Sequence, residues 1–298
     1  MECIPNFSEG RSLEVVKRLV DIVRSGGVEL LDYSSDPDHN RTVITYAGDM
    51  KDVVETAFKL ARQAMAEIDI CFHSGVHPRI GALDVLPLVP LGNTTLDDCI
   101  SAVRKLGKRL GKELQLPVYY YGCAARDASR ARLSDLRRGG LEGLKERMLH
   151  NPDWRPDEGP EYLHPTAGAA ALGVRKPLIA YNVNLLSDDL KAAQRIAAHI
   201  RESGGGLHGV DALGVRLAEA GMVQVTVNLR DAGLTSLDMI YDAICAAADE
   251  EGIRVDGGEL VGMVPLDEVM RIFGRATGLP GIGPERVLEW KLKERVGF

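Results

Sequence analysis

The sequence predicts an α+β protein in which two βαββαβ units pack sheet to sheet, with their helices outside. Segments with the periods of strands and helices follow the same order in both halves of the chain, which is the split-βαβ arrangement. Each sheet would be bare on one face, and packing one sheet against the other would cover both faces. A cleft between the two units is then the expected ligand site.

The first unit is predicted from residues 2 to 121. Apolar residues at helical spacing predict a helix over residues 12–24, which Gly26 and Gly27 end, and an amphipathic helix over residues 53–65. Apolar or alternating runs predict strands over residues 2–7, 28–33, 42–47 and 84–89. A further helix over 96–114 and an aromatic strand over 118–121 extend the unit, whereas residues 122–165 are less regular and include a loop at 150–160.

The second unit repeats this order after residue 177. The expected strands cover residues 178–186, 212–218, 223–229 and 254–264, and the expected helices cover residues 188–203 and 236–251. Sequence identity between the two halves is slight, so we interpret the repetition as a shared pattern and a candidate old duplication.

Composition and charge exclude several classes of partner. The net charge of −7 and the aromatic content of 5% argue against nucleic acid. The five cysteines are scattered and lack CxxC spacing, which favours reduced thiols in a cytosolic protein. The chain does not open like a signal peptide, and no apolar run approaches the roughly 18 residues of a membrane span. We therefore expect a cytoplasmic protein with no membrane partner.

Residues 72–91 are the stretch in which we expect chemistry. A polar loop carries His73, His77 and Arg79 and leads directly into the apolar run 83–91. Two histidines four residues apart can chelate a metal on a helix, but Gly75 and Pro78 disfavour a helix and no HExxH pattern is present. A single loop histidine suffices as a general base, because its pKa lies near the operating pH.

Other motifs leave alternatives open. In DPDHNRT (36–42), Arg41 is suited to bidentate binding of a carboxylate, although a solvated turn fits as well. The segment 165–173, PTAGAAALG, would let a planar ligand approach the backbone closely, but a plain linker fits equally. GGGLHG (204–209) matches GxGxxG, yet it follows a helix, so we interpret it as a flexible loop.

Taken together, several segments resemble glutamate formimidoyltransferases, the histidine-degradation enzymes that are fused in animals to a cyclodeaminase. The resemblance rests on ECIPNFSEG, DPDHNRT, HPRIGALDVLPLVPL, PVYYYGCAAR, RKPLIAYNVNLL and ELVGMVPL, which occur in the family's order over nearly the whole chain. The last segment lies close to the end, so we expect the transferase part without the cyclodeaminase part.

The resemblance implies a fold and a reaction. Members of this family carry two ferredoxin-like subdomains with sheets face to face and a folate tunnel between them, here residues 1–177 and 178–298. They transfer a formimidoyl group from N-formimidoyl-L-glutamate to N5 of tetrahydrofolate. Tetrahydrofolate is thus expected as co-substrate, with small molecules as the only substrates, no metal and a homodimeric assembly.

The resemblance also implies site residues. The catalytic histidine of the HPRIGALD segment is His77, and His73 becomes a supporting residue. The folate-binding segment is expected at Leu163, His164, Pro165, Thr166, Ala167, Gly168, Ala169, Ala170, Ala171 and Leu172. Arg41, Arg79 and Arg126 are candidates for the glutamate carboxylates. Asn6, Asn182 and Asn184 are candidates for the pterin, and Asp84 or Asp38 for orienting the imidazole of His77.

Three competing classes of function remain. The same scaffold would serve formyl transfer from N-formylglutamate or cyclisation of 5-formyltetrahydrofolate. A non-catalytic folate-binding protein would need no titrating base, which makes the His77–Arg79 pair hard to explain. A metal hydrolase using His73, His77 and Asp84 would hold zinc.

Overall fold

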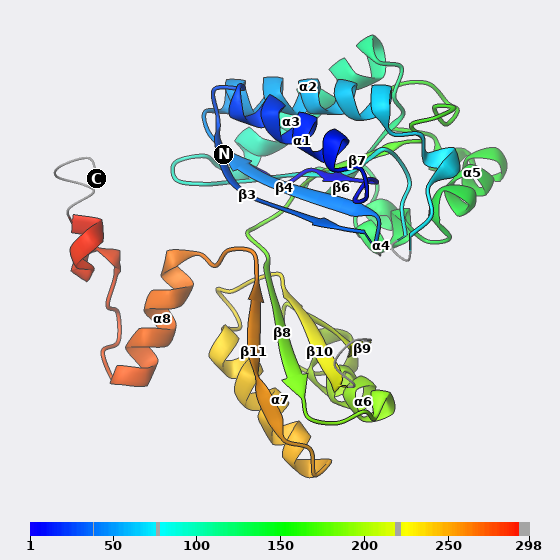
Figure 1. The fold of residues 1–298 in the computed structure, drawn as a ribbon. Coiled ribbons are helices and arrows are strands. Elements are labelled where there is room, and N and C mark those ends of the chain that lie inside the picture. Colours follow the sequence, from blue (N-terminus) through cyan, green and yellow to red (C-terminus); the bar gives the residue numbers. More distant parts are fainter. Residues whose placement is uncertain (38, 76–77, 218–221, 292–298) are drawn as a thin grey trace. The chain divides into compact units, whose positions relative to one another are not determined.

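The chain forms two compact units, Met1–Lys176 and Pro177–Phe298, each with one sheet and its own helices (Figure 1). The computed structural model describes residues 1–37, 39–75, 78–217 and 222–291. His77 and Asp38, two of the predicted site residues, lie outside the described residues. The α+β class with two subdomains of ferredoxin-like topology is confirmed. The packing of one sheet against the other, with a tunnel between, stays a prediction.

The first unit contains a seven-stranded sheet. Its strands are β1 Glu2–Cys3, β2 Asn6–Phe7, β3 Glu29–Asp36, β4 Arg41–Ala47, β5 Leu83–Val89, β6 Val118–Gly122 and β7 Ala170–Val174. Strands β3 and β4 pair antiparallel, β4 and β5 flank β1 and β2, and β7 and β6 follow β5 in parallel. The predicted strand 2–7 is split into β1 and β2 around Pro5, which has no backbone N–H to give to the ladder.

Helices α1, α2 and α3 cover one face of this sheet (Figure 1). The helices of the unit are α1 Leu13–Arg24, α2 Met50–Glu67, α3 Leu96–Glu113, α4 Leu133–Leu136 and α5 Gly140–His150. Helix α1 forms because Ser12 caps its first turn and five apolar residues, among them Leu19 and Val23, recur on its buried face. On the other face, side chains of α4 and α5 pack against Tyr119 and Tyr121 of β6.

Strand β7 is the main difference from the predicted elements of this unit. The segment 165–173 left a ligand approach or a linker open, but Ala170–Val174 pairs in parallel with both β5 and β6. Its alanines and glycine carry little strand propensity of their own, so the two flanking strands impose the conformation. A Cβ on Gly173 would lie 2.4 Å from the Tyr121 ring, so close ring packing also requires a small residue here.

The second unit is a four-stranded antiparallel sheet in the order β11-β8-β10-β9. Its strands are β8 Ile179–Leu185, β9 Val210–Leu217, β10 Met222–Leu229 and β11 Val255–Val261, and its helices are α6 Leu190–Ile200, α7 Leu237–Glu250 and α8 Leu266–Thr277. Helices α6 and α7 pack on one face of the sheet.

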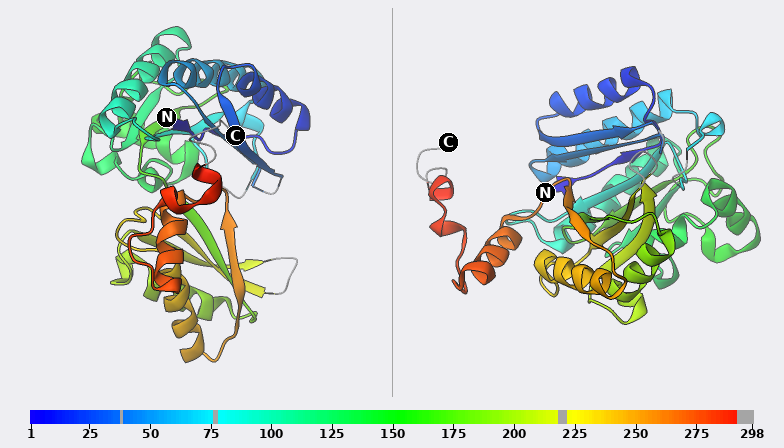
Figure 2. Two further views of the ribbon diagram at one scale, coloured as in Figure 1. Left: turned by 90° about the vertical axis from the view of Figure 1, so that its left-hand side faces the viewer. Right: turned by 60° about the horizontal axis from the view of Figure 1, so that its bottom comes forward.

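Helix α8 was not predicted, and it docks on the start of α7 (Figure 2). The buried carboxylate of Glu268 accepts a hydrogen bond from the backbone N–H of Leu237 at 2.7 Å and pairs with Arg271. A carboxylate at a helix N-terminus satisfies a free backbone donor and interacts favourably with the helix dipole.

Within the part of the chain that the structure describes, no helix has the length and apolar character needed to cross a membrane.

Candidate active site

Loops that are far apart in the sequence meet at one end of the first sheet, and Asn40 joins three of them. Its side-chain oxygen accepts from the Gly10 N–H at 2.9 Å, and its amide donates to the Ser74 carbonyl at 3.2 Å. Its own carbonyl lies 2.9 Å from Nε2 of His73. Asn40 is buried and adopts a left-handed conformation (φ 49°), which asparagine tolerates better than most residues. The DPDHNRT motif is therefore a structural junction and more than a solvated turn.

The loop before β5 is hydrogen-bonded to the predicted folate segment, almost 90 residues later. The Ile70 N–H donates to the Thr166 carbonyl, the Ala82 N–H to the Ala167 carbonyl and the Ala169 N–H to the Ile80 carbonyl, each at 2.9 Å. Gly81 and Gly168 form an antiparallel bridge between the same segments. The structure thus brings together the loop before β5 and the predicted folate segment, two stretches that are far apart in the sequence.

Gly81 is packed too tightly for any side chain. A Cβ there would lie 1.9 Å from the carbonyl oxygen of Ala169 and 2.7 Å from that of Ala167. On its other side, the Ser8 hydroxyl donates to the Gly81 carbonyl at 2.7 Å. The glycine of HPRIGALD is therefore needed for the close approach of two backbones.

The folate segment is partly exposed at its start and buried beyond it. Leu163, His164, Pro165 and Thr166 are partly or fully accessible, whereas Ala167 and Ala169–Leu172 are buried. His164 and Gly168 exchange backbone hydrogen bonds at 2.9 Å and close a tight turn, in which Gly168 has φ +66°. Ala170 and Leu172 point into the helix-side core, so those two side chains anchor the strand.

His164 has its Nδ1 atom occupied by the turn. Nδ1 accepts from the backbone N–H of Ala167 at 3.1 Å, and the Thr166 N–H lies 3.4 Å away. A ring that accepts at Nδ1 is neutral and carries its proton on Nε2. Burial, which disfavours the charged form, lowers the pKa of His164 below its usual value.

Four polar residues form a largely buried cluster next to these loops, three of them on strands and the fourth at the end of α4. Arg41 donates to the side-chain oxygen of Asn6, and the side-chain amide nitrogen of Asn6 donates to the Ile4 carbonyl at 2.7 Å. Asp84, 3% exposed, accepts from the Ile80 N–H at 2.8 Å and forms an ion pair with Arg137 at the end of α4. Arg137 was not predicted as a site residue, because it is one of several arginines in a region without a regular sequence pattern.

The cations of this cluster influence each other. Burial, and secondarily the proximity of Arg137, lower the pKa of Arg41 to about 10, although Asp84 acts in the opposite direction. Burial also raises the pKa of the neighbouring Tyr121 to about 12. Arg41 stays charged at neutral pH, yet its desolvated guanidinium would interact more strongly with an anion than an exposed one would.

The other two candidate arginines make different contacts. Arg79 donates to the carbonyls of His73 and Ile70 at 3.4 and 3.5 Å and closes its own loop. Arg126 is bound to the Asp157 carbonyl at 2.8 Å and to the Glu158 carboxylate at 2.5 Å, so it is not part of the Asn6–Arg41–Asp84 cluster.

The residues of the metal-hydrolase alternative contact other groups where they are described. Nε2 of His73 is directed at the Asn40 carbonyl, and both oxygens of Asp84 are hydrogen-bonded or ion-paired. Among the described residues, no three histidine, cysteine or acidic side chains gather as a metal site would require.

The second unit holds the two remaining candidates. Asn182 and Asn184 lie on β8, on the sheet face opposite α6 and α7, beside Gln224 of β10 and Glu259 of β11. Gln224 and Glu259 were not predicted as site residues, although Glu259 opens the ELVGMVPL segment.

Comparison with known proteins defines the class of protein. Residues 1–175 match the formiminotransferase domain, N-terminal subdomain, and residues 180–274 match the formiminotransferase domain. Glutamate formimidoyltransferase of Streptococcus pyogenes serotype M1 is 42% identical over 91% of both chains. That of Thermoplasma acidophilum is 38% identical over 99% of this chain and 97% of its own. The protein is therefore a transferase with two α+β subdomains.

More particularly, the chain belongs to the formiminotransferase domain family. Formimidoyltransferase-cyclodeaminase of Sus scrofa is 44% identical over 91% of this chain, which corresponds to 51% of that longer protein. Among solved structures, a putative glycine cleavage system transcriptional repressor aligns with a TM-score of 0.32 and 8% identity over 88% of this chain and 98% of its own, a likeness that carries no argument.

Replacing Gly81 by alanine is expected to separate the two hydrogen-bonded segments. The clash with two carbonyl oxygens forces backbone shifts, and overpacking of this kind costs about 1–3 kcal/mol or more of the free energy of unfolding. Urea unfolding measures the change. Gly233→Ala is the control, because its Cβ would meet only the Asp231 side chain at 3.1 Å. Equal midpoints for the two variants would contradict the close-approach interpretation.

His164 is expected to titrate below the ordinary histidine value of about 6.5. Because the pKa of His164 is lower in the folded protein, protonation of this ring favours the unfolded chain. The folded state therefore keeps its full stability above pH 6.5, and the free energy of unfolding decreases as the pH falls from 6.5 toward the lower pKa of the folded protein. An NMR titration of the imidazole protons, assigned with His164→Asn, measures the midpoint. A midpoint at or above 6.5 would show that the turn does not select the neutral ring.

Proposed function

We propose that this chain transfers the formimidoyl group from N-formimidoyl-L-glutamate to N5 of tetrahydrofolate, giving 5-formimidoyltetrahydrofolate and L-glutamate, a step of histidine degradation. The observation that carries the proposal is the match of both units to one family, together with relatives named glutamate formimidoyltransferase over most of their length. The hydrogen bonds between the HPRIGALD loop and the folate segment support a common site for both substrates.

His77 is the proposed catalytic residue and acts as both base and acid. The neutral N5 amine attacks the carbon of the protonated amidine. A C–N bond forms, the C=N π electrons move onto the amidine nitrogen, and N5 becomes cationic. His77 accepts the proton from N5, which prevents the intermediate from reverting. It then gives that proton to the glutamate nitrogen as the bond between this nitrogen and the carbon breaks, the C=N bond re-forms and glutamate leaves. General acid–base catalysis of this kind contributes typically about 10²–10⁴ in rate.

Arg41 is the strongest candidate among the arginines for a glutamate carboxylate. Its guanidinium is buried near Arg137, and desolvation strengthens its interaction with an anion. Asn6, which contacts Arg41, would help to position the same group. Asp84, held by Arg137 and by the Ile80 N–H, stabilises the end of the HPRIGALD loop. Arg79 and Arg126 are weaker candidates, because Arg79 closes its own loop and Arg126 is bound to Asp157 and Glu158, away from the Asn6–Arg41–Asp84 cluster.

The proposal includes four further points. Residues 1–177 carry the catalytic histidine, and residues 178–298 contribute residues that bind folate. Tetrahydrofolate is the co-substrate, and no metal takes part. The protein is cytoplasmic, in keeping with its five free cysteines, two of which are exposed. It acts as a homodimer on small molecules, without nucleic acid.

Purified protein is expected to transfer the formimidoyl group faster than the formyl group. The assay supplies tetrahydrofolate with N-formimidoyl-L-glutamate or with N-formyl-L-glutamate and follows glutamate release and the folate product. A preference for the formyl donor, or ATP-dependent cyclisation of 5-formyltetrahydrofolate without transfer, would assign the rival folate activity. Binding of folate without turnover of either donor would indicate a non-catalytic binding protein.

His77→Ala is expected to bind tetrahydrofolate nearly as the unmodified protein does and to lose about 10²–10⁴ in kcat. The loss follows because the variant lacks the proposed acceptor of the N5 proton. Steady-state kinetics and equilibrium binding separate the two effects. His150→Gln, at the exposed end of α5, is the control and should leave both unchanged. Near-normal kcat in His77→Ala would remove the histidine from the mechanism.

A further inference from the structure

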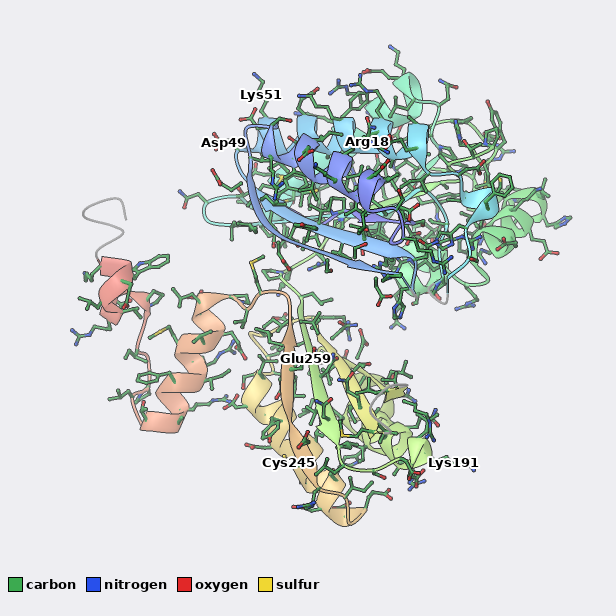
Figure 3. The ribbon with its side chains drawn as sticks, in the orientation of Figure 1. Arg18, Asp49, Lys51, Lys191, Cys245 and Glu259 are labelled. Atoms are coloured by element: carbon green, nitrogen blue, oxygen red, sulfur yellow. The ribbon has the colours of Figure 1, made fainter. Side chains whose placement is uncertain are left out.

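The sheet of the second unit carries a polar patch on the face opposite its helices. Strand register pairs Asn184 with Gln224 and Gly257, and pairs Asn182 with Glu259. Side chains of directly paired residues lie on the same face of a sheet. Because the alternate residues Val183 and Val225 belong to the core under α6 and α7, the four polar side chains share the other face. Figure 3 labels Glu259 on β11.

These four side chains are linked to each other. Gln224 is only 5% exposed, and its amide nitrogen donates to the Asn184 side-chain oxygen at 2.8 Å and to Oε2 of Glu259 at 3.4 Å. The Asn182 amide lies 3.5 Å from the same Oε2 atom. Both amide contacts of Glu259 thus involve one oxygen. Among the described residues, Oε1 of Glu259 has no hydrogen bond, and the Asn184 amide nitrogen donates to none.

The patch is open beside its carboxylate, next to a β-bulge between Val255 and Gly257. Gly257 sits next to Asn184 in the pairing, and a Cβ there would meet nothing within 4 Å. Glu259 itself is exposed, so its carboxylate is accessible from the open side. A planar ring could therefore lie against the strands with one edge toward the carboxylate and the amides.

We propose that Glu259 binds the 2-amino-4-oxopyrimidine edge of the folate pterin. That edge presents two neighbouring donors, N3–H and the 2-amino group, followed by the O4 acceptor. A carboxylate accepts from two adjacent donors in a bidentate, charge-assisted manner, and an asparagine amide beside it donates to O4. In the patch, the two carboxylate oxygens of Glu259 are followed by the amide donor of Asn184. This order complements the order on the ring, where two donors are followed by the O4 acceptor.

This inference rests on the proposed function, since it identifies residues that recognise its co-substrate. It also extends the site, because it adds Glu259 and Gln224, neither of which was predicted as a site residue, to the pterin candidates Asn182 and Asn184. A site built to hydrogen-bond a substrate group rejects an analogue that lacks the group far more strongly than an apolar pocket would. Glu259 is therefore expected to determine specificity for 2-amino pterins.

The test measures the dissociation constants of tetrahydrofolate and of 2-desaminotetrahydrofolate by anaerobic calorimetry, for the unmodified chain and for Glu259→Gln. The unmodified chain is expected to bind the desamino analogue about 10- to 100-fold more weakly, the range for losing a charge-assisted hydrogen bond. Glu259→Gln should bind tetrahydrofolate about 10- to 100-fold more weakly and discriminate between the two ligands less than about threefold. Glu250→Gln, at the exposed end of α7, is the matched control and should behave like the unmodified chain.

Equal discrimination by the unmodified chain and Glu259→Gln would overturn the inference, whatever the absolute affinities. If the unmodified chain transfers the formimidoyl group and Glu259→Gln still discriminates, only the pterin assignment fails. If the unmodified chain neither binds tetrahydrofolate nor turns over, the proposed function fails with it. Thermal unfolding of both variants verifies the fold, and a glutamine of the same shape at this exposed position is expected to preserve it.

Discussion

The candidate active site depends on the backbone hydrogen bonds between the loop before β5 and the turn before β7. Ile70, Ile80 and Ala82 exchange bonds with Thr166, Ala169 and Ala167, and each of these groups would otherwise be partly buried without a partner. The close approach is possible because Gly81 has no side chain. The same contacts place β7 beside β5, so the candidate site and the central part of the sheet depend on the same backbone hydrogen bonds.

Around this junction the protein buries polar groups in pairs. Asn40 accepts a hydrogen bond from a loop N–H, donates one to the Ser74 carbonyl and contacts the His73 ring through its own carbonyl. Asp84 accepts a hydrogen bond from a backbone N–H and forms an ion pair with Arg137. Leaving such a group without its partner costs about 1–3 kcal/mol, so the network gives the loops one arrangement. Catalytic groups on loops need support of this kind, because a loop alone does not hold a side chain to the precision that proton transfer requires.

The second unit contributes a different kind of surface. Its core includes alternate aliphatic residues of β8 and β10 under α6 and α7, and the opposite face carries the amides Asn182, Asn184 and Gln224 and the carboxylate of Glu259. A sheet with one face on its helices and one polar face has the alternation expected of an antiparallel sheet. Here the polar face is unusual because Gln224 is almost fully buried within it, and burial of an amide is favourable only when its hydrogen bonds are made.

The sequence by itself determined the α+β class, the βαββαβ order in both halves, the family and the motifs that carry the site. These follow from local periodicity and from residue types at short spacing, which are properties of contiguous segments. It did not determine β7, because a run of alanines becomes a strand only between two strands that need a partner. The pairing of Arg137 with Asp84, the junction role of Asn40 and the contact of Gln224 with Glu259 likewise join residues 30 to 53 positions apart. Only the tertiary structure could decide them, since no local pattern specifies which distant partner a polar side chain meets.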